Sequence, residues 1–294
     1  NLASALAPGI GWLLAARVLV GFCMGGIWAI AGGLAARLVP AARIGLATSI
    51  IFGGVAAASV LGVPLGALIG EALGWRWAFL AMGVFSGLVL LLHLWVVPAL
   101  PVEGSVRARQ FLQQLGNRGL QRGLLLTLLL VGGHFIAFTY VRPLLSTLAQ
   151  VDASWIGALL FAYGLVGILG NFIVGPLAAR RPRGVLLAIA LGLLLTPLLL
   201  LSVGGAPAVG VAVLLLWGLA YGGVSVGLMT WMMKAVPQAV EIATALYVGV
   251  FNIGIALGAW GGGLLVDGIG LQANLWAAAG FAAVATLFVM TTRK

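Results

Sequence analysis

The sequence predicts an all-α membrane protein, because it is very poor in charge and its apolar runs have the length of spanning helices. Of its 294 residues, 63% are hydrophobic and 7% are charged, and the mean hydropathy is +1.22. A water-soluble domain has about 25% charged residues, so this chain could not cover its surface in water. The apolar runs are about 20 residues long and lack the alternation typical of barrel strands. This composition excludes a soluble enzyme, a nucleic-acid-binding protein and a disulfide-rich scaffold.

Charged residues and Pro/Gly breaks divide the chain into nine hydrophobic segments, and we expect each segment to form one spanning helix. The breaks contain, in order, Arg37 and Arg43, Gly74, a long polar stretch, Asp152, Arg180 to Arg183, Pro207, Lys234 and Asp267. The segments cover residues 11–36, 45–70, 75–98, 123–148, 154–178, 184–203, 208–233, 241–266 and 270–291.

The polar stretch from Pro98 to Arg122 is the only connection long enough to separate two helix bundles. It contains four arginines and four glutamines. We therefore expect a first bundle in residues 1–98, a central cytoplasmic linker in residues 99–122 and a second bundle in residues 123–294.

Lysine and arginine indicate the orientation of the segments, because the cytoplasmic loops of membrane proteins are enriched in both. Twelve of the fifteen basic residues fall on one side, together with the C-terminus. We expect that side to face the cytoplasm of a bacterial cell, with the segments in the inner membrane. The excess charge is then a topology signal that also attracts anionic lipid.

Segments one to three recur as segments seven to nine in the same orientation, which indicates a parallel internal repeat. Segments four to six have no earlier counterpart. The simplest explanation is a twelve-helix protein with two parallel six-helix halves, of which this sequence contains helices 4 to 12. At an offset of 197 residues, Gly21, Gly25 and Pro40 recur as Gly218, Gly222 and Pro237, and at an offset of 196, Gly62, Gly66 and Gly74 recur as Gly258, Gly262 and Gly270.

Four stretches resemble motifs of the major facilitator superfamily, in particular its sugar-efflux and drug-efflux branch, the arabinose-efflux-permease-like group. They are LLAARVLVGFCMGGIWA around Arg17, GVPLGALIGEALGWRWAF from Gly62 to Phe79, GHFIAFTYVRPLL from Gly133, and FNIGIALGAWGGG from Phe251. The resemblance covers essentially the whole chain. The second stretch reads GVP where many antiporters of the family have GP, and the family's signature loop between helices 2 and 3 lies outside this sequence.

Glycines at four-residue spacing form ridges without side chains, where another helix can approach closely. Pro64 removes a backbone donor and is expected to bend its helix. The resemblance implies that this helix packs between the two halves, whereas generic small-residue packing would produce the same pattern. The predicted conformational and packing motif is Gly62, Pro64, Gly66 and Gly70, with Gly254, Gly258 and Gly262 as the equivalent contact in the second bundle.

Arg17 is a permanent charge within an apolar segment, where a guanidinium is expensive unless it faces a partner or a wet cavity. The helical stripe that starts there continues through Met24 and Trp28. The resemblance implies a role for Arg17 in proton coupling or substrate binding, and snorkelling to the outer interface is the alternative.

His134 lies in the middle of its segment, where a neutral imidazole can be buried and can accept a proton near neutral pH. Phe138, Tyr140 and Arg142 follow toward the outer end. No carboxylate lies in the middle of a segment, so the proton carrier is either His134 or an acid in helices that this sequence does not contain. A histidine satisfied by a backbone carbonyl is the alternative.

Tyr221 and Ser225 correspond to Met24 and Trp28 through the 197-residue offset, so they are expected to face the central cavity from the second bundle. Both could bond a hydroxylated substrate. Asn252 is an isolated amide at depth, which serves either as a substrate contact or to hold helices together.

These features predict a secondary active transporter that exports a small sugar-like or drug-like solute by alternating access, coupled to proton entry. A proton-driven uptake permease and a transport-dead membrane sensor or remnant are the alternatives. No nucleotide-binding loop, metal motif or Ser/His dyad appears in the sequence. We therefore expect no enzymatic activity, no cofactor, no metal and no nucleic-acid partner. The expected partners are the solute, protons and the bilayer, and we expect a monomer.

Overall fold

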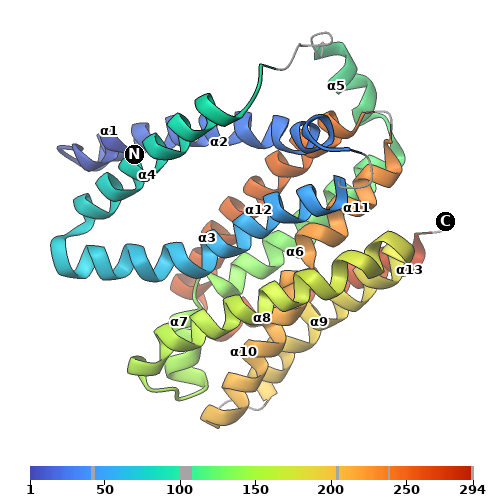
Figure 1. The fold of residues 1–294 in the computed structure, drawn as a ribbon. Helices are drawn as coiled ribbons and strands as arrows, with labels where there is room; N and C mark the ends of the chain where they lie inside the picture. The colour runs from blue at the N-terminus through green and yellow to red at the C-terminus, as the bar shows by residue number, and fades with distance from the viewer. Residues whose placement is uncertain (41–43, 100–107, 203–204, 238, 293–294) are drawn as a thin grey trace.

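The structure is a computed structural model that describes residues 1–40, 44–99, 108–202, 205–237 and 239–292 (Figure 1). Some side chains within helices, among them those of Arg37, Pro64 and Glu241, lie outside the described part. The described residues form helices and contain no strand. The helices are α1 (Leu2–Ala5), α2 (Ile10–Leu38), α3 (Ile44–Leu73), α4 (Trp75–Val96), α5 (Ala108–Leu115), α6 (Arg118–Phe138), α7 (Val141–Pro143), the π-helix η2 (Leu144–Leu148), α8 (Ala153–Arg180), α9 (Pro182–Ser202), α10 (Pro207–Gly222), α11 (Val224–Ala235), α12 (Val240–Gly268) and α13 (Leu271–Thr291).

All nine predicted hydrophobic segments are helical, so the all-α prediction is confirmed. Within the described residues, eight stretches are long and apolar enough to cross a membrane, and α3 is a further apolar helix of 30 residues. Two segments are interrupted: residues 123–148 divide into α6, α7 and η2, and residues 208–233 divide at Gly223 between α10 and α11. Within the stretch expected to be the linker, the structure contains α5, and α6 begins at Arg118.

Gly74 and Gly270, which correspond in the internal repeat, make the same kind of turn. Gly74 connects α3 to α4 with φ +93°, and Gly270 connects α12 to α13 with φ +120°. Side chains disfavour positive φ, so both turns require glycine. A shared backbone requirement at matching positions supports a duplicated helical unit.

The buried core lies between residues 120 and 289, from which the whole main hydrophobic cluster is drawn. There α6 packs against α12 and α13, and α10 packs against α8 and α9. The first bundle meets this core where α2 contacts α12 and α3 contacts α8. Figure 1 shows α1, α2 and α4 along one side of the molecule and α9, α10 and α13 along the other. No residue of α4 is buried, which is the surface expected of a helix that faces lipid.

Two polar side chains cap helices of the second bundle. Asn117 Oδ1 accepts the N–H groups of Gly119 at 2.8 Å and Leu120 at 3.1 Å, at the start of α6. Asp152 Oδ1 accepts the N–H of Ser154 at 2.8 Å, at the start of α8. The hydrogen bonds from the Ser154 hydroxyl and N–H lower the pKa of the exposed Asp152 carboxyl.

Replacing Asn117 with alanine is expected to destabilise the protein by about 1 kcal/mol, because two N–H groups lose their acceptor. For a domain of 150–250 residues this corresponds to a fall in melting temperature of about 2–4 °C. Thermal unfolding in detergent measures it. The matched control is Ser202→Ala, whose hydroxyl donates to Leu199 O at 3.2 Å near an exposed helix end. Equal melting temperatures of the two variants would contradict the capping role.

Candidate functional site

Six aromatic side chains from α6, α8 and α10 pack together in the second bundle, and we call them the His134 cluster. His134 lies at its centre and is 3% exposed. Its ring stacks on Tyr221, with ring centroids 3.5 Å apart and planes 11° apart, and on Phe138 at 4.7 Å and 23°. The members are His134, Phe135, Phe138, Tyr163, Trp217 and Tyr221.

The remaining rings enclose this stack from its edges and its far end. Trp217 meets His134 edge-to-face at 5.4 Å, and Tyr163 stacks on Phe138 at 4.6 Å. Trp217 is 2% exposed. Offset and edge-to-face pairs of this kind contribute about 0.5–1.5 kcal/mol each beyond burial. The cluster is therefore a closely packed group of aromatic rings that stabilise one another.

Glycines of α10 bring α8 and α10 close enough to form the cluster. A Cβ on Gly218 would lie 2.6 Å from the carbonyl oxygen of Tyr163, and one on Gly222 would overlap the backbone of Gly167. On α6, a Cβ on Gly133 would lie 2.6 Å from Phe281 Cβ of α13. Small residues thus set the helix spacing that lets the larger rings interleave.

Several polar atoms in and beside the cluster are buried and have no hydrogen-bond partner within the described residues. They are both ring nitrogens of His134 and the hydroxyl of Tyr163. On α12, Tyr247 is 3% exposed, packs on Phe251 at 5.6 Å and has the Ser225 hydroxyl beside its own. Buried polar groups are normally hydrogen-bonded, and an unsatisfied set indicates a site for a water, an ion or a ligand. This arrangement offers aromatic faces together with unused donors and acceptors.

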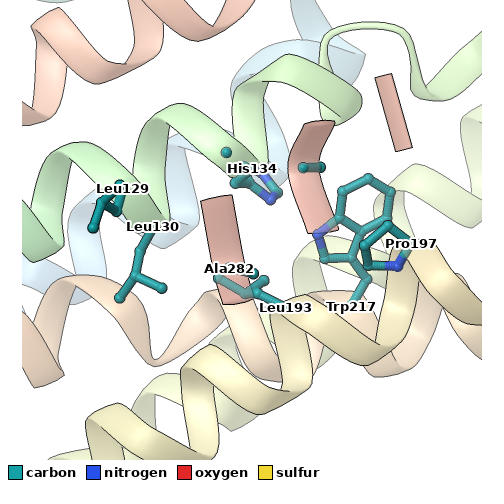
Figure 2. Close-up of a pocket in the computed structure, with 9 residues that line it drawn as sticks. Leu129, Leu130, His134, Leu193, Pro197, Trp217 and Ala282 are labelled. Atoms are coloured by element: carbon teal, nitrogen blue, oxygen red, sulfur yellow. The ribbon is translucent and has the colours of Figure 1, made fainter. Parts of the chain in front are cut away.

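A small hollow lies beside His134, on the side facing α9 and α13 (Figure 2). Its volume is about 10 Å³, and it is lined by His134 together with Leu193, Pro197, Trp217 and Ala282. A cavity must have at least about 10–15 Å³ to hold a single water. The hollow is therefore far too small for a solute.

Arg17 is held by the N-terminal helices and not by the His134 cluster. Its Nη2 donates to Asn1 Oδ1 at 3.0 Å and to Ser4 Oγ at 2.6 Å, and its guanidinium lies 4.5 Å from the centroid of the Phe79 ring. Nε has no partner among the described residues. These three contacts of Arg17 hold α1 against α2 and α4.

The other predicted site residues are dispersed. Tyr140 is half-buried and its hydroxyl donates to Ala259 O of α12 at 3.1 Å. Asn252 is exposed and donates to Val248 O of its own helix at 2.8 Å. Arg142 and Met24 are exposed, and Trp28 and Ser225 are half-exposed. Of the predicted residues, the structure thus brings together His134, Phe138 and Tyr221.

Sequence reasoning did not single out Tyr163 and Tyr247 as site residues. Each is a tyrosine in the middle of an apolar run. That position could have indicated a site residue, because a buried phenol hydroxyl normally has a hydrogen-bond partner. Among the described side chains, the carboxylates Glu71, Asp152 and Asp267 are exposed at helix ends. No group of three or more His, Cys, Asp and Glu side chains suited to a metal occurs in that part of the chain.

The two glycine ridges differ in the structure. Gly254, Gly258 and Gly262 of α12 pack on α6 of the same bundle: a Cβ on Gly258 would lie 2.5 Å from Gly132 O. These glycines therefore allow α12 to approach the backbone of α6 closely. A Cβ on Gly62, Gly66 or Gly70 would meet no described atom within 4 Å. The ring of Pro64 lies outside the described side chains.

The chain is similar to known membrane transporters over most of its length. Residues 2–241 match the family model described as Major Facilitator Superfamily. The chain is 36% identical to the transcription regulatory protein OpdE of Pseudomonas aeruginosa, over 99% of this chain and 73% of that protein. It is 33% identical to the purine ribonucleoside efflux pump NepI of Salmonella paratyphi A, over 94% of this chain and 70% of that protein. The crystal structure of the transporter FucP in the outward conformation superposes with a TM-score of 0.74 at 18% identity, covering 99% of this chain and 78% of that chain.

Proposed function

The chain belongs to the major facilitator superfamily, and from this we propose that it exports a small solute with a planar ring and hydroxyl groups, such as a nucleoside, in exchange for protons. A nucleoside combines a sugar with an aromatic base, so it falls within the sugar-like or drug-like class that the sequence indicates. The two bundles, residues 1–98 and 123–294, would rock about a site near the middle of the membrane.

The observation that carries this proposal is the set of unpartnered polar atoms in and beside the His134 cluster. The rings of the cluster stack on one another, with Phe138 stacked on both His134 and Tyr163, so a planar base would stack there once these rings move apart. The free ring nitrogens of His134 and the hydroxyl of Tyr163 could bond its polar edges and its ribose. The 33% identity to a protein named as a purine ribonucleoside efflux pump supports the same solute class.

His134 is the proposed proton carrier, since imidazole is the side chain that titrates nearest to neutral pH. In the described part of the chain it is the titratable group at the centre of the second bundle, while the described carboxylates are exposed at helix ends. Arg17 is proposed to support this exchange from the first bundle by holding α1, α2 and α4 together. The positive-inside distribution supports an inner-membrane protein with a cytoplasmic C-terminus, and we propose that it acts as a monomer.

A transport-dead sensor is the second candidate function, and one observation favours it. The relative with 36% identity is named a transcription regulatory protein. A sensor could use the same His134 cluster to bind a solute without moving it. An uptake permease would use the same site with the opposite direction of net transport.

The test is transport into proteoliposomes that contain the purified protein, with an imposed pH gradient. We expect a nucleoside such as adenosine or inosine to move against proton flow, faster than ribose alone or a planar cation such as ethidium. Protein-free liposomes are the control. Movement of none of these solutes would overturn the proposal. A nucleoside-dependent rise in melting temperature without any movement would identify the sensor instead.

A further inference from the structure

The span that carries His134 is broken near its outer end. The helix α6 ends at Phe138, and α7 and the π-helix η2 follow after a turn at residues 139–140. Pro143 cannot donate to the carbonyl of Thr139, and the Thr139 hydroxyl donates to Phe135 O at 2.7 Å. In η2 the hydroxyls of Ser146 and Thr147 both donate to Pro143 O. The local sequence therefore stabilises a broken helix at this point.

The break removes the helical partner of one carbonyl. In a continuous α-helix the N–H of Tyr140 would bond to Ile136 O, but here it bonds to Ala137 O at 3.0 Å. Ile136 O accepts instead from Asn274 Nδ2 of α13 at 2.9 Å. Asn274 is 0% exposed. A side chain from another helix thus replaces the missing backbone bond.

A second side chain ties the same point to α12. The hydroxyl of Tyr140 donates to Ala259 O at 3.1 Å. The backbone of α12 can come this close because it carries glycines: a Cβ on Gly262 would lie 2.5 Å from Ile136 O, and one on Gly263 would lie 2.8 Å from the Tyr140 hydroxyl oxygen. The break is therefore fastened from both α12 and α13.

We propose that Asn274 and Tyr140 form a latch that holds the span containing His134 in its bent form, and that release of the latch straightens the span. Ile136 O has two alternative partners, Asn274 Nδ2 in the bent form and the N–H of Tyr140 in a continuous helix. Asn274 Oδ1 has no partner among the described residues, so the bent form leaves one buried acceptor unsatisfied, which lowers its stability. An element with two such arrangements is what a transporter needs to alternate between states. The transport role of this latch rests on the proposed function.

The experiment measures the shape of the span directly. Spin labels are placed at Ser146→Cys in η2 and Ile269→Cys after α12, in a background where the single cysteine, the exposed Cys23, is replaced by serine. Double electron–electron resonance then measures the distribution of distances between the two labels, which reports the populations of the two forms. We expect Asn274→Leu and Tyr140→Phe each to change the population ratio by about threefold to tenfold, the usual effect of one interhelical hydrogen bond in a membrane protein.

The matched control is Thr286→Val on the same helix as Asn274. The Thr286 hydroxyl is buried and donates to Ala282 O of its own helix at 2.8 Å, so its loss should leave the distances unchanged. If Asn274→Leu fails to fold, Tyr140→Phe decides the question, because it removes one hydroxyl only. Distances in folded variants that match those of the parent would overturn the latch. The distances are measured without a solute. A failure of nucleoside transport would therefore overturn the proposed function, whereas the latch would still be tested by the distances.

Discussion

Replacing Gly222 with alanine is expected to prevent most of the protein from accumulating in a folded form. The added methyl group would overlap the backbone atoms of Gly167 in α8, and backbone cannot rotate away as a side chain can. Overpacking a core with side chains typically costs about 1–3 kcal/mol, and a collision with backbone forces two helices apart. The Tyr163 ring on α8 would then move away from Phe138, and the Tyr221 ring on α10 would move away from His134.

The control for Gly222→Ala is Gly249→Ala on α12, where an added Cβ meets no described atom within 4 Å. Both substitutions gain up to about 1 kcal/mol of helix propensity, so any difference between them reports the collision alone. Size-exclusion profiles and melting temperatures in detergent provide the measurement. We expect Gly249→Ala to equal or exceed the parent in stability. A Gly222→Ala protein that was as stable as this control would show that α8 and α10 are not in close contact.

The helices could be predicted because they depend on local properties of the chain. Apolar runs of spanning length predicted all nine, and Gly74 and Gly270 marked turns of positive φ in both copies of the repeat. The interruptions were not predicted. The break after Phe138 depends on Pro143, on two side-chain hydroxyls and on Asn274 from a helix more than a hundred residues away. No periodicity in a single segment contains that information.

The site was predicted in part, for a related reason. His134 stood out because a polar residue in the middle of an apolar run is conspicuous, and Tyr221 emerged from the internal repeat. Tyr163 escaped notice because its contact with Gly218 depends on how closely α8 and α10 approach. Glycine spacing also does not indicate which helix a ridge packs against: Gly254, Gly258 and Gly262 of α12 lie against α6.

The proposed proton coupling at His134 depends on what surrounds its ring. As a neutral ring it stacks on Tyr221 and Phe138 without a hydrogen-bond partner in the described residues. A charged imidazolium in the same place would lack a counter-ion among those residues, and a charge in a membrane interior is costly. Contact with aromatic faces offsets part of that cost. Protonation is therefore expected to favour a rearranged cluster in which the ring reaches water or solute.

Replacing His134 with phenylalanine is expected to abolish transport driven by a pH gradient while leaving the fold intact. Phenylalanine keeps the stacking on Tyr221 and Phe138 but removes both nitrogens, so the site loses its titratable group and two hydrogen-bonding positions. His134→Gln restores hydrogen bonding without a titratable ring. If His134 carries the proton, His134→Gln should still exchange labelled for unlabelled nucleoside across the bilayer, a reaction that needs no net proton movement, and should fail only in gradient-driven transport.

The matched control for His134→Phe is His93→Phe on α4, where the histidine is exposed and its Nδ1 lies 2.9 Å from Val89 O of its own helix. That variant should transport like the parent. Loss of both exchange and gradient-driven transport in a folded His134→Gln protein would assign His134 to solute binding and not to proton transfer. Full gradient-driven transport by His134→Phe would remove His134 from the mechanism, because no proton can bind to the phenyl ring. The proton carrier would then have to be sought outside the His134 cluster.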